Sequence, residues 1–179
     1  VYMMAVASDR PERGGLRSKP IGIQANLCIN LAKGKGEVKL NSKDFRDQPF
    51  LDFNYLNEEE DRRRFRDGVK MLVELEKHPD MSSLIQKRLT PLESDLQSDR
   101  NLNSWLMKEI STGHHISCTN KMGKDDDESA VVDQTGKVYG VKNLRVVDAS
   151  IMPECVRANI NVTVMVIAER IADFIKEEA

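Results

Sequence analysis

Two adjacent histidines, His114 and His115, are the side chains in this sequence best suited to acid–base chemistry. They lie in the stretch STGHHISCTNKMG, residues 111–123, directly after a predicted helix and before a polar turn. An imidazole ordinarily titrates close to neutral pH, so it can accept and release a proton under physiological conditions. The pair is therefore either part of a surface loop or an imidazole base held at a reaction site, and the rest of the sequence must decide between the two.

Other chemistries have weaker signals in the sequence. The cysteines are far apart and show no C-x-x-C spacing, which argues against a zinc site and indicates a reducing compartment. Gly34 and Gly36 match only the first two glycines of a dinucleotide-binding loop, so we expect no phosphate-cradling motif. The acidic run at residues 124–128 lacks the ligand spacing of a calcium loop and predicts a solvated turn, so we expect no metal. The three cysteines are Cys28, Cys118 and Cys155.

The composition narrows the range of partners. The chain has 27 basic and 29 acidic residues, a formal net charge of −2 and 5% aromatic residues. This balance is not that of a nucleic-acid-binding protein. No apolar run approaches the roughly 20 residues that a membrane span needs, and the first residues show no signal-peptide pattern. We therefore expect a soluble, cytoplasmic protein with no nucleic-acid partner and no membrane span.

Alternating apolar residues predict a half-buried strand over residues 21–31, followed by a tight turn at 33–36 and a second strand at 38–40. These two strands would form an antiparallel hairpin, and the polar face of the first is a candidate ligand-binding surface. A second, smaller hairpin is predicted around Gln134-Thr135-Gly136, followed by a short apolar strand at 144–147 that ends at Asp148.

Apolar residues at helical spacing predict three main helices. The first covers residues 58–77, and the second begins at a cap formed by Ser98 or Asp99 and ends before Gly113. The third is a long apolar helix capped by Asn161. A weaker helix is predicted at 81–89, and residues 93–101 are predicted to form a loop. The free N–H groups at the start of the third helix suit an anionic group.

Three segments near the end of the chain resemble, in order and spacing, the C-terminal signature of the glucose-methanol-choline (GMC) family of FAD-dependent oxidoreductases. The segments are STGHHISCTNKMG, AVVDQTGKVYGVKNLRVVDASIMPE and ANINVTVMVIAERIADFI. Upstream, GEVKLNSKDFRDQPFLDFNYLNEEEDRRRFRDGVK is similar to a strand and helix of the family's substrate domain, so the resemblance spans roughly residues 36–175. Cys118 and Asn120 depart from the family's common Gly and Cys, which affects the expected pocket shape and substrate more than the chemistry.

The resemblance implies an α+β fold. Residues 1–123 would form a substrate-binding domain with an antiparallel sheet, flanking helices and the catalytic histidine turn. Residues 124–179 would supply the C-terminal strand and helix that complete an FAD-binding α/β domain. The family binds FAD through an N-terminal G-x-G-x-x-G unit that these residues lack. The implied cofactor is therefore FAD, held together with an FAD-binding N-terminal part that belongs to the same protein or to a separate chain.

The resemblance also assigns catalytic roles. Counted back from Met122-Gly123, the family's histidine base falls on His115, and His114 beside it is a weaker candidate for the substrate pocket. The family's second catalytic position, His or Asn, falls on Asn159. An amide cannot act as a base, but it can hold the oxygen of an alcohol substrate in line and donate a hydrogen bond to it.

Four further residues are implied cofactor contacts. Asp148 and Ala149 match the segment that approaches the pyrophosphate and ribityl region of FAD. The backbone N–H groups around Asn161 and Val162 would face the pyrimidine side of the flavin and stabilise negative charge there.

Two other functions stay open at the level of the sequence. The chain could be a non-catalytic substrate-binding or interaction module without flavin, or it could use the same fold as a hydroxynitrile lyase.

Overall fold

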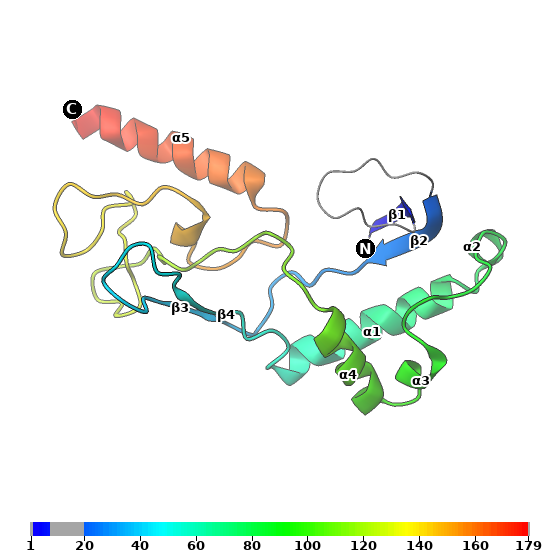
Figure 1. Cartoon of the computed structure of the whole chain (residues 1–179). Helices are drawn as coiled ribbons and strands as arrows, with labels where there is room; N and C mark the ends of the chain where they lie inside the picture. The colour runs from blue at the N-terminus through cyan, green and yellow to red at the C-terminus, as the bar shows by residue number, and fades with distance from the viewer. Residues whose placement is uncertain (1, 8–19, 179) are drawn as a thin grey trace. The chain divides into compact units, whose positions relative to one another are not determined.

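In the computed structural model, which describes residues 2–7 and 20–178, the chain forms two compact units (Figure 1). The first unit consists of Val1–Gly34 and Asn54–Ile110, and the second of Lys35–Phe53 and Ser111–Ala179. Each unit is therefore built from two separate segments of the chain, and the histidine turn belongs to the second.

The first unit combines a two-stranded antiparallel sheet with helices. Strands β1 and β2 pair with Tyr2 opposite Asn26. The core lies mainly between α1 and α4 and consists of Leu56, Val69, Leu102 and Leu106. The elements are β1 Tyr2–Ala7, β2 Pro20–Asn26, α1 Glu59–Leu75, α2 Pro79–Ser82, α3 Glu93–Leu96 and α4 Asp99–Glu109.

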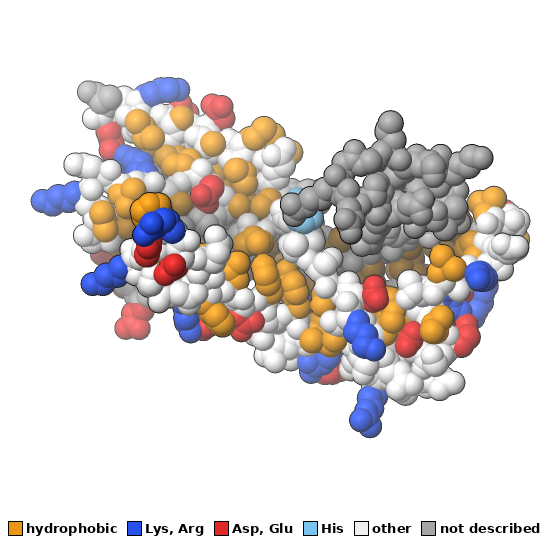
Figure 2. Space-filling model, viewed as in Figure 1, with side chains coloured by type: hydrophobic (Ala, Val, Ile, Leu, Met, Phe, Trp, Pro, Cys, Tyr) orange, Lys and Arg blue, Asp and Glu red, His pale blue; other side chains and the backbone are white. Residues whose placement is uncertain are grey.

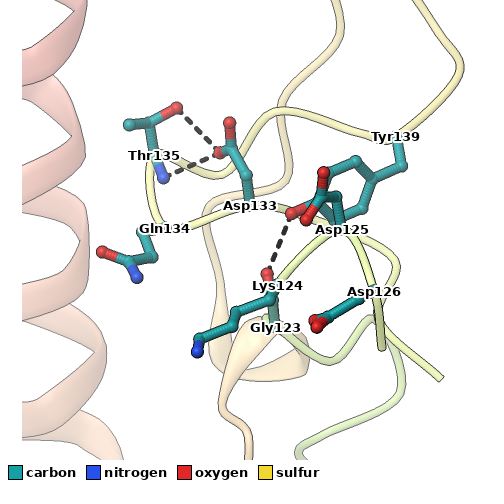
Figure 3. Close-up of a pocket in the computed structure, with 8 residues that line it drawn as sticks. All are labelled: Gly123, Lys124, Asp125, Asp126, Asp133, Gln134, Thr135 and Tyr139. Atoms are coloured by element: carbon teal, nitrogen blue, oxygen red, sulfur yellow. Dashed lines mark hydrogen bonds between the residues drawn. The ribbon is translucent and has the colours of Figure 1, made fainter. Parts of the chain in front are cut away.

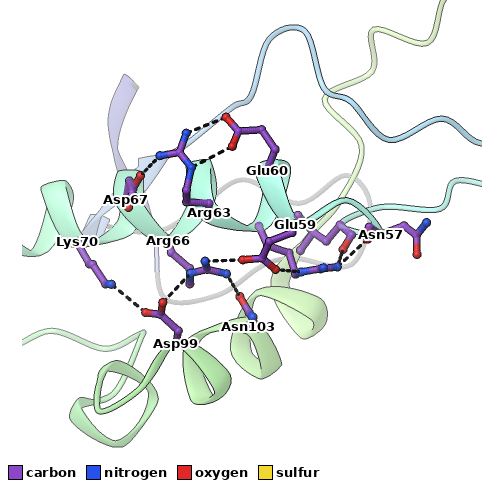
Figure 4. Close-up of polar contacts among 11 residues, drawn as sticks. Asn57, Glu59, Glu60, Arg63, Arg66, Asp67, Lys70, Asp99 and Asn103 are labelled. Atoms are coloured by element: carbon purple, nitrogen blue, oxygen red, sulfur yellow. Dashed lines mark hydrogen bonds and ion pairs between the residues drawn. The ribbon is translucent and has the colours of Figure 1, made fainter.

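A polar network centred on Arg66 joins α1 to α4 beside this core (Figure 4). The Arg66 side chain is buried, and its Nη2 donates to Glu59 Oε1 at 2.7 Å. Its Nη1 donates to Asn103 Oδ1 at 2.9 Å, and its Nε lies 3.3 Å from Asp99 Oδ2. The guanidinium therefore has partners on both helices, as a buried charge requires.

The predicted hairpin between residues 21–31 and 38–40 is wrong. Strand β2 pairs with β1, and residues 33 and 34 are held by α1 instead of forming a hairpin turn. The buried carboxylate of Asp61 accepts hydrogen bonds from the backbone N–H of Lys33 at 2.9 and 3.0 Å and from that of Gly34 at 2.8 Å. Arg64 reaches the same stretch and donates to the carbonyl of Leu31 at 3.0 Å.

The second unit contains the other antiparallel pair, a short 3-10 turn and the long C-terminal helix. Its core consists of Val132, Ile151 and Ile171. Gly36 precedes the strand pair, and a Cβ at this position would lie 2.1 Å from the carbonyl oxygen of Asp52. The elements are β3 Glu37–Lys39, β4 Phe50–Asp52, η1 Ala149–Ile151 and α5 Asn161–Glu178.

The small hairpin predicted around residues 134–136 is confirmed. Val132 and Val138 pair antiparallel, and Gly136 has a φ of +76°. A glycine adopts this left-handed conformation at little cost, so it suits the turn. The strand predicted at 144–147 is reduced to one bridge, between Lys137 and Arg145.

The structure also tests the predicted helices. The helices predicted at 58–77 and after Ser98 are confirmed as α1 and α4, and Ser98 Oγ accepts from the N–H of Asn101 at 3.1 Å. The helix predicted at 81–89 is wrong because α2 ends at Ser82. The loop predicted at 93–101 is also wrong, since it contains α3 and the start of α4. Leu96 of α3 packs against the core, which stabilises this short helix.

The mixture of helices with small antiparallel sheets agrees with the predicted α+β class, although each described sheet has two strands. The predicted boundary between residues 123 and 124 falls inside the second compact unit. Assignment of these units to a substrate domain and an FAD domain stays a prediction. Among the described residues, no helix has the length and apolar character needed to cross a membrane.

Candidate active site

The histidine turn contains two residues in the left-handed backbone region. His114 has a φ of +62° and Cys118 a φ of +72°. The backbone N–H of His114 donates to Thr112 Oγ1 at 3.0 Å, and the side chains of His114 and His115 are both exposed. Left-handed backbone is uncommon for residues other than glycine, so the surrounding structure must hold this turn in place.

The segment that follows the turn is hydrogen-bonded to the three residues of η1. The N–H of Cys118 donates to the carbonyl of Ala149 at 3.2 Å. The N–H of Asn120 donates to the carbonyl of Ser150 at 2.9 Å, and that of Met122 donates to the carbonyl of Ile151 at 2.9 Å. Alternate residues of one segment thus bond to successive residues of the other, so the histidine turn and the predicted cofactor-contacting turn are attached to each other.

Asp148 caps η1, which fixes the second of these turns. Asp148 Oδ1 accepts from the N–H of Ser150 at 2.8 Å, and the hydroxyl of Ser150 accepts from Asn120 Nδ2 at 3.0 Å. Asp148 is exposed, whereas Ala149, Ser150 and Asn120 are half-buried.

The core of the second unit supports both turns and α5. Ile151 is fully buried at the end of η1, and Met122 packs against the same cluster from the histidine segment. Ile171, on α5, is 2% exposed and completes the cluster. One core therefore anchors the segment after His115, the turn after Asp148 and the helix that begins at Asn161.

The start of α5 suits negative charge. Asn161 is the first helical residue, so its predicted role as the cap is wrong, and residue 160 stands before the helix. The first turn contains no acidic residue. The first N–H groups of a helix lack partners within the helix and carry the positive end of its dipole. Asn159, Asn161 and Val162 are all exposed here.

All seven predicted site residues lie in the second unit. The structure brings the histidine turn together with Asp148 and Ala149 through the bonds described above. Convergence of His115 and Asn159 on one substrate stays a prediction. The seven residues are His114, His115, Asp148, Ala149, Asn159, Asn161 and Val162.

An open pocket of approximately 460 Å³ lies elsewhere in this unit, and its lining contains none of the predicted site residues (Figure 3). Tyr139 donates from its hydroxyl to the carbonyl of Gly123 at 2.9 Å. Desolvation and the nearby carboxylates of Asp133, Asp125 and Asp126 raise the pKa of the Tyr139 phenol. This pocket was not predicted, because its lining comes from two turns that are separate in the sequence. Its residues are Gly123, Lys124, Asp125, Asp126, Asp133, Gln134, Thr135 and Tyr139.

Comparison with known proteins places these segments among the oxidoreductases. A family model described as GMC oxidoreductase matches residues 32–168, which is more than half of the chain. The chain belongs to the GMC oxidoreductase family, and the resemblance found in its C-terminal segments is confirmed.

Two similar curated proteins are oxygen-dependent choline dehydrogenases. The protein from Ectopseudomonas mendocina is 41% identical over 156 residues, which cover 87% of this chain and 27% of that protein. The protein from Pseudomonas putida is 39% identical over 158 residues, which cover 88% of this chain and 27% of that protein. The chain thus spans about a quarter of the length of these relatives.

Solved structures show the same similarity. A formate oxidase from Aspergillus oryzae has a TM-score of 0.75 and 32% identity, and the match covers 82% of this chain and 25% of the oxidase. Pyridoxine 4-oxidase from Mesorbium loti has a TM-score of 0.70 and 30% identity, with 77% of this chain and 26% of the oxidase covered.

Proposed function

We propose that this chain supplies catalytic and cofactor-contacting residues to an FAD-dependent enzyme that oxidises an alcohol to a carbonyl compound. Its membership of the GMC oxidoreductase family supports this function. The structural observation that carries the proposal is the attachment of the histidine segment to Ala149, Ser150 and Ile151. This attachment joins the predicted base-bearing turn to the predicted cofactor-contacting turn within one compact unit.

His115 is the proposed base. An alcohol is a poor hydride donor until its O–H proton leaves, so the reaction needs a neutral base within hydrogen-bond reach. A nitrogen of the His115 imidazole takes the hydroxyl proton as the substrate's C–H bond gives up its hydride. Asn159 holds the substrate oxygen, and His114 lines the pocket beside it.

FAD supplies the two-electron acceptor for that hydride when it is bound. The residues present fit such a group, because the start of α5 offers backbone N–H groups and no acidic side chain in its first turn. Asn161 and Val162 would contribute these N–H groups, and Asp148 and Ala149 would approach the ribityl and pyrophosphate region.

The partner proposed for the second unit is the flavin-binding part of the enzyme. Apolar side chains are exposed along α5, where they are visible in Figure 2. Val162, Met165 and Val166 are 66%, 52% and 63% exposed, although the opposite side of the helix packs on the core. A helix that is apolar on more than one side suits burial between two layers. These residues would complete the FAD-binding domain.

The proposal is tested by anaerobic mixing of an alcohol with the complete flavoprotein, in which this chain is joined to or combined with its flavin-binding part. Choline is the first alcohol to use, because two similar relatives are choline dehydrogenases. Loss of oxidised-flavin absorbance with formation of the aldehyde is expected. A flavin that stays oxidised with every alcohol in a broad panel would contradict the proposal and favour a lyase, and a colourless complete protein would favour a binding module.

A further inference from the structure

We propose that Asn120 and Ser150 are positioning residues, which hold the turn of His115 against the turn of Asp148 and Ala149 during the reaction. This inference rests on the proposed function, because it assigns the two side chains an effect on the rate of substrate oxidation.

The two residues form a double contact. The Asn120 N–H donates to the Ser150 carbonyl at 2.9 Å, and Asn120 Nδ2 donates to Ser150 Oγ at 3.0 Å. The N–H of Ser150 in turn donates to Asp148 Oδ1 at 2.8 Å. The N–H, the carbonyl and the hydroxyl of Ser150 are thus all engaged, and Ser150 connects the histidine segment directly to the carboxylate that caps η1.

This contact lies where it can restrain the histidine turn. It is flanked by two backbone hydrogen bonds, from Cys118 to Ala149 and from Met122 to Ile151. Cys118, two residues before Asn120, has a φ of +72°, a left-handed backbone that is unfavourable for a residue other than glycine and persists only where its surroundings enforce it. Because both side chains are half-buried, their hydrogen bond is partly shielded from competition by water.

A small loosening of this contact has a large expected kinetic effect. Misplacement of a reacting group by about 1 Å can reduce a rate by about 100-fold. Asn120→Ala or Ser150→Ala leaves the three backbone bonds available, so the fold is retained but the turn is held less firmly. We therefore expect each variant to lower the limiting rate of flavin reduction roughly 5- to 50-fold.

The experiment compares five variants of the complete flavoprotein: Asn120→Ala, Ser150→Ala, the double variant, Ser150→Thr and Thr119→Ala. Flavin reduction by saturating alcohol is followed anaerobically across pH, and rates are expressed per bound flavin so that loss of folded protein does not enter. Ser150→Thr keeps the hydroxyl and should restore the rate to within about threefold of the parent. Thr119→Ala alters an exposed side chain of the same segment and should leave the rate unchanged.

A double-mutant cycle separates positioning from general destabilisation. If the side chains act as one unit, the double variant is no slower than the slower single variant. The apparent pKa of the rate profile should stay that of the parent while its plateau falls, since the base itself is intact. Additive effects of the two substitutions, or a Ser150→Thr rate as low as that of Ser150→Ala, would overturn the proposal.

The His115→Ala variant is the reference that separates a failure of the positioning role from a failure of the proposed base. Unchanged reduction rates in Asn120→Ala and Ser150→Ala, together with a large loss in His115→Ala, would refute the positioning role and leave the proposed function standing. An unchanged rate in His115→Ala would refute the proposed role of the base itself.

Discussion

The carboxylate of Asp61, in the first turn of α1, binds the backbone N–H groups of Lys33 and Gly34, which lie 28 and 27 residues earlier in the chain. The Asp61 side chain is almost fully buried, and hydrogen bonds to a charged group contribute more to stability than neutral ones. We predict that Asp61→Asn raises the hydrogen-exchange rates of the Lys33 and Gly34 amides at least about 10-fold, equivalent to roughly 1.4 kcal/mol. Asp67→Asn, at an exposed position of the same helix, is the control and should leave both rates close to the parent values.

Gly36 and Gly68 should respond differently to a methyl group. A Cβ at Gly36 would lie 2.1 Å from the backbone oxygen of Asp52, so the β3–β4 pair must shift. A Cβ at Gly68 would lie 2.5 and 2.8 Å from the two Leu27 methyl groups and 3.2 Å from its Cγ, so a side chain and not the backbone must move, and alanine also favours the helix. We predict that Gly36→Ala destabilises the protein by roughly 2 kcal/mol or more and Gly68→Ala by less than about 1 kcal/mol. Thermal unfolding of both variants tests this order, and equal losses would contradict it.

Acid should break the ion pair between Lys121, in the histidine segment, and Asp127. The hydrogen bond from Lys121 Nζ at 2.7 Å, with those from Ser129, lowers the pKa of Asp127 to about 2. Because the folded-state pKa lies below the ordinary value of 3.8, the pair stabilises the fold above about pH 4 and this contribution disappears as the pH falls through 2. We predict that Lys121→Met moves the carboxyl titration of Asp127, followed by NMR, back toward 3.8.

Lys124→Met is the matched control for that titration, since Lys124 is an exposed lysine in the adjacent turn. It should leave the pKa of Asp127 near its low value. A similar shift in both variants would mean that net charge, and not the contact with Lys121, depresses this pKa.

Asn159 and Asn161 separate a side-chain role from a backbone role. The predicted contribution of Asn159 is its amide, whereas that of Asn161 is its backbone N–H, which alanine retains. We predict that Asn159→Ala slows flavin reduction by roughly 100-fold and Asn161→Ala by less than about 10-fold. Rapid anaerobic mixing with alcohol measures both rates. A larger loss at Asn161 would show that the amide acting on the substrate is the one at the first position of α5.

Local patterns in the sequence predicted the elements that depend on local forces. The apolar stripes of α1, α4 and α5 were visible because each helix packs one side on a core. The Gly136 turn was visible because it needs a left-handed residue. The hairpin turn predicted at residues 33–36 is wrong because Asp61, far along the chain, accepts hydrogen bonds from the backbone N–H groups of Lys33 and Gly34. Nothing within residues 21–40 encodes this contact.

In the candidate site, too, the sequence identified the residues, whereas contacts between distant residues required the structure. Its residues were found by their order in a family signature, and the family is confirmed. The link between Asn120 and Ser150 joins side chains 30 residues apart, so it needed coordinates. The pocket beside Tyr139 was missed for the same reason. A cytoplasmic location stays a prediction from composition.

The most direct measurement is the limiting rate of anaerobic flavin reduction by alcohol in His115→Ala and His114→Ala forms of the complete flavoprotein. The two residues are adjacent and both exposed, so each serves as the control for the other. Loss of a general base typically lowers a rate by roughly 100- to 10,000-fold. We predict a loss of that size for His115→Ala and less than about 10-fold for His114→Ala. Equal rates in the parent and His115→Ala proteins would contradict it.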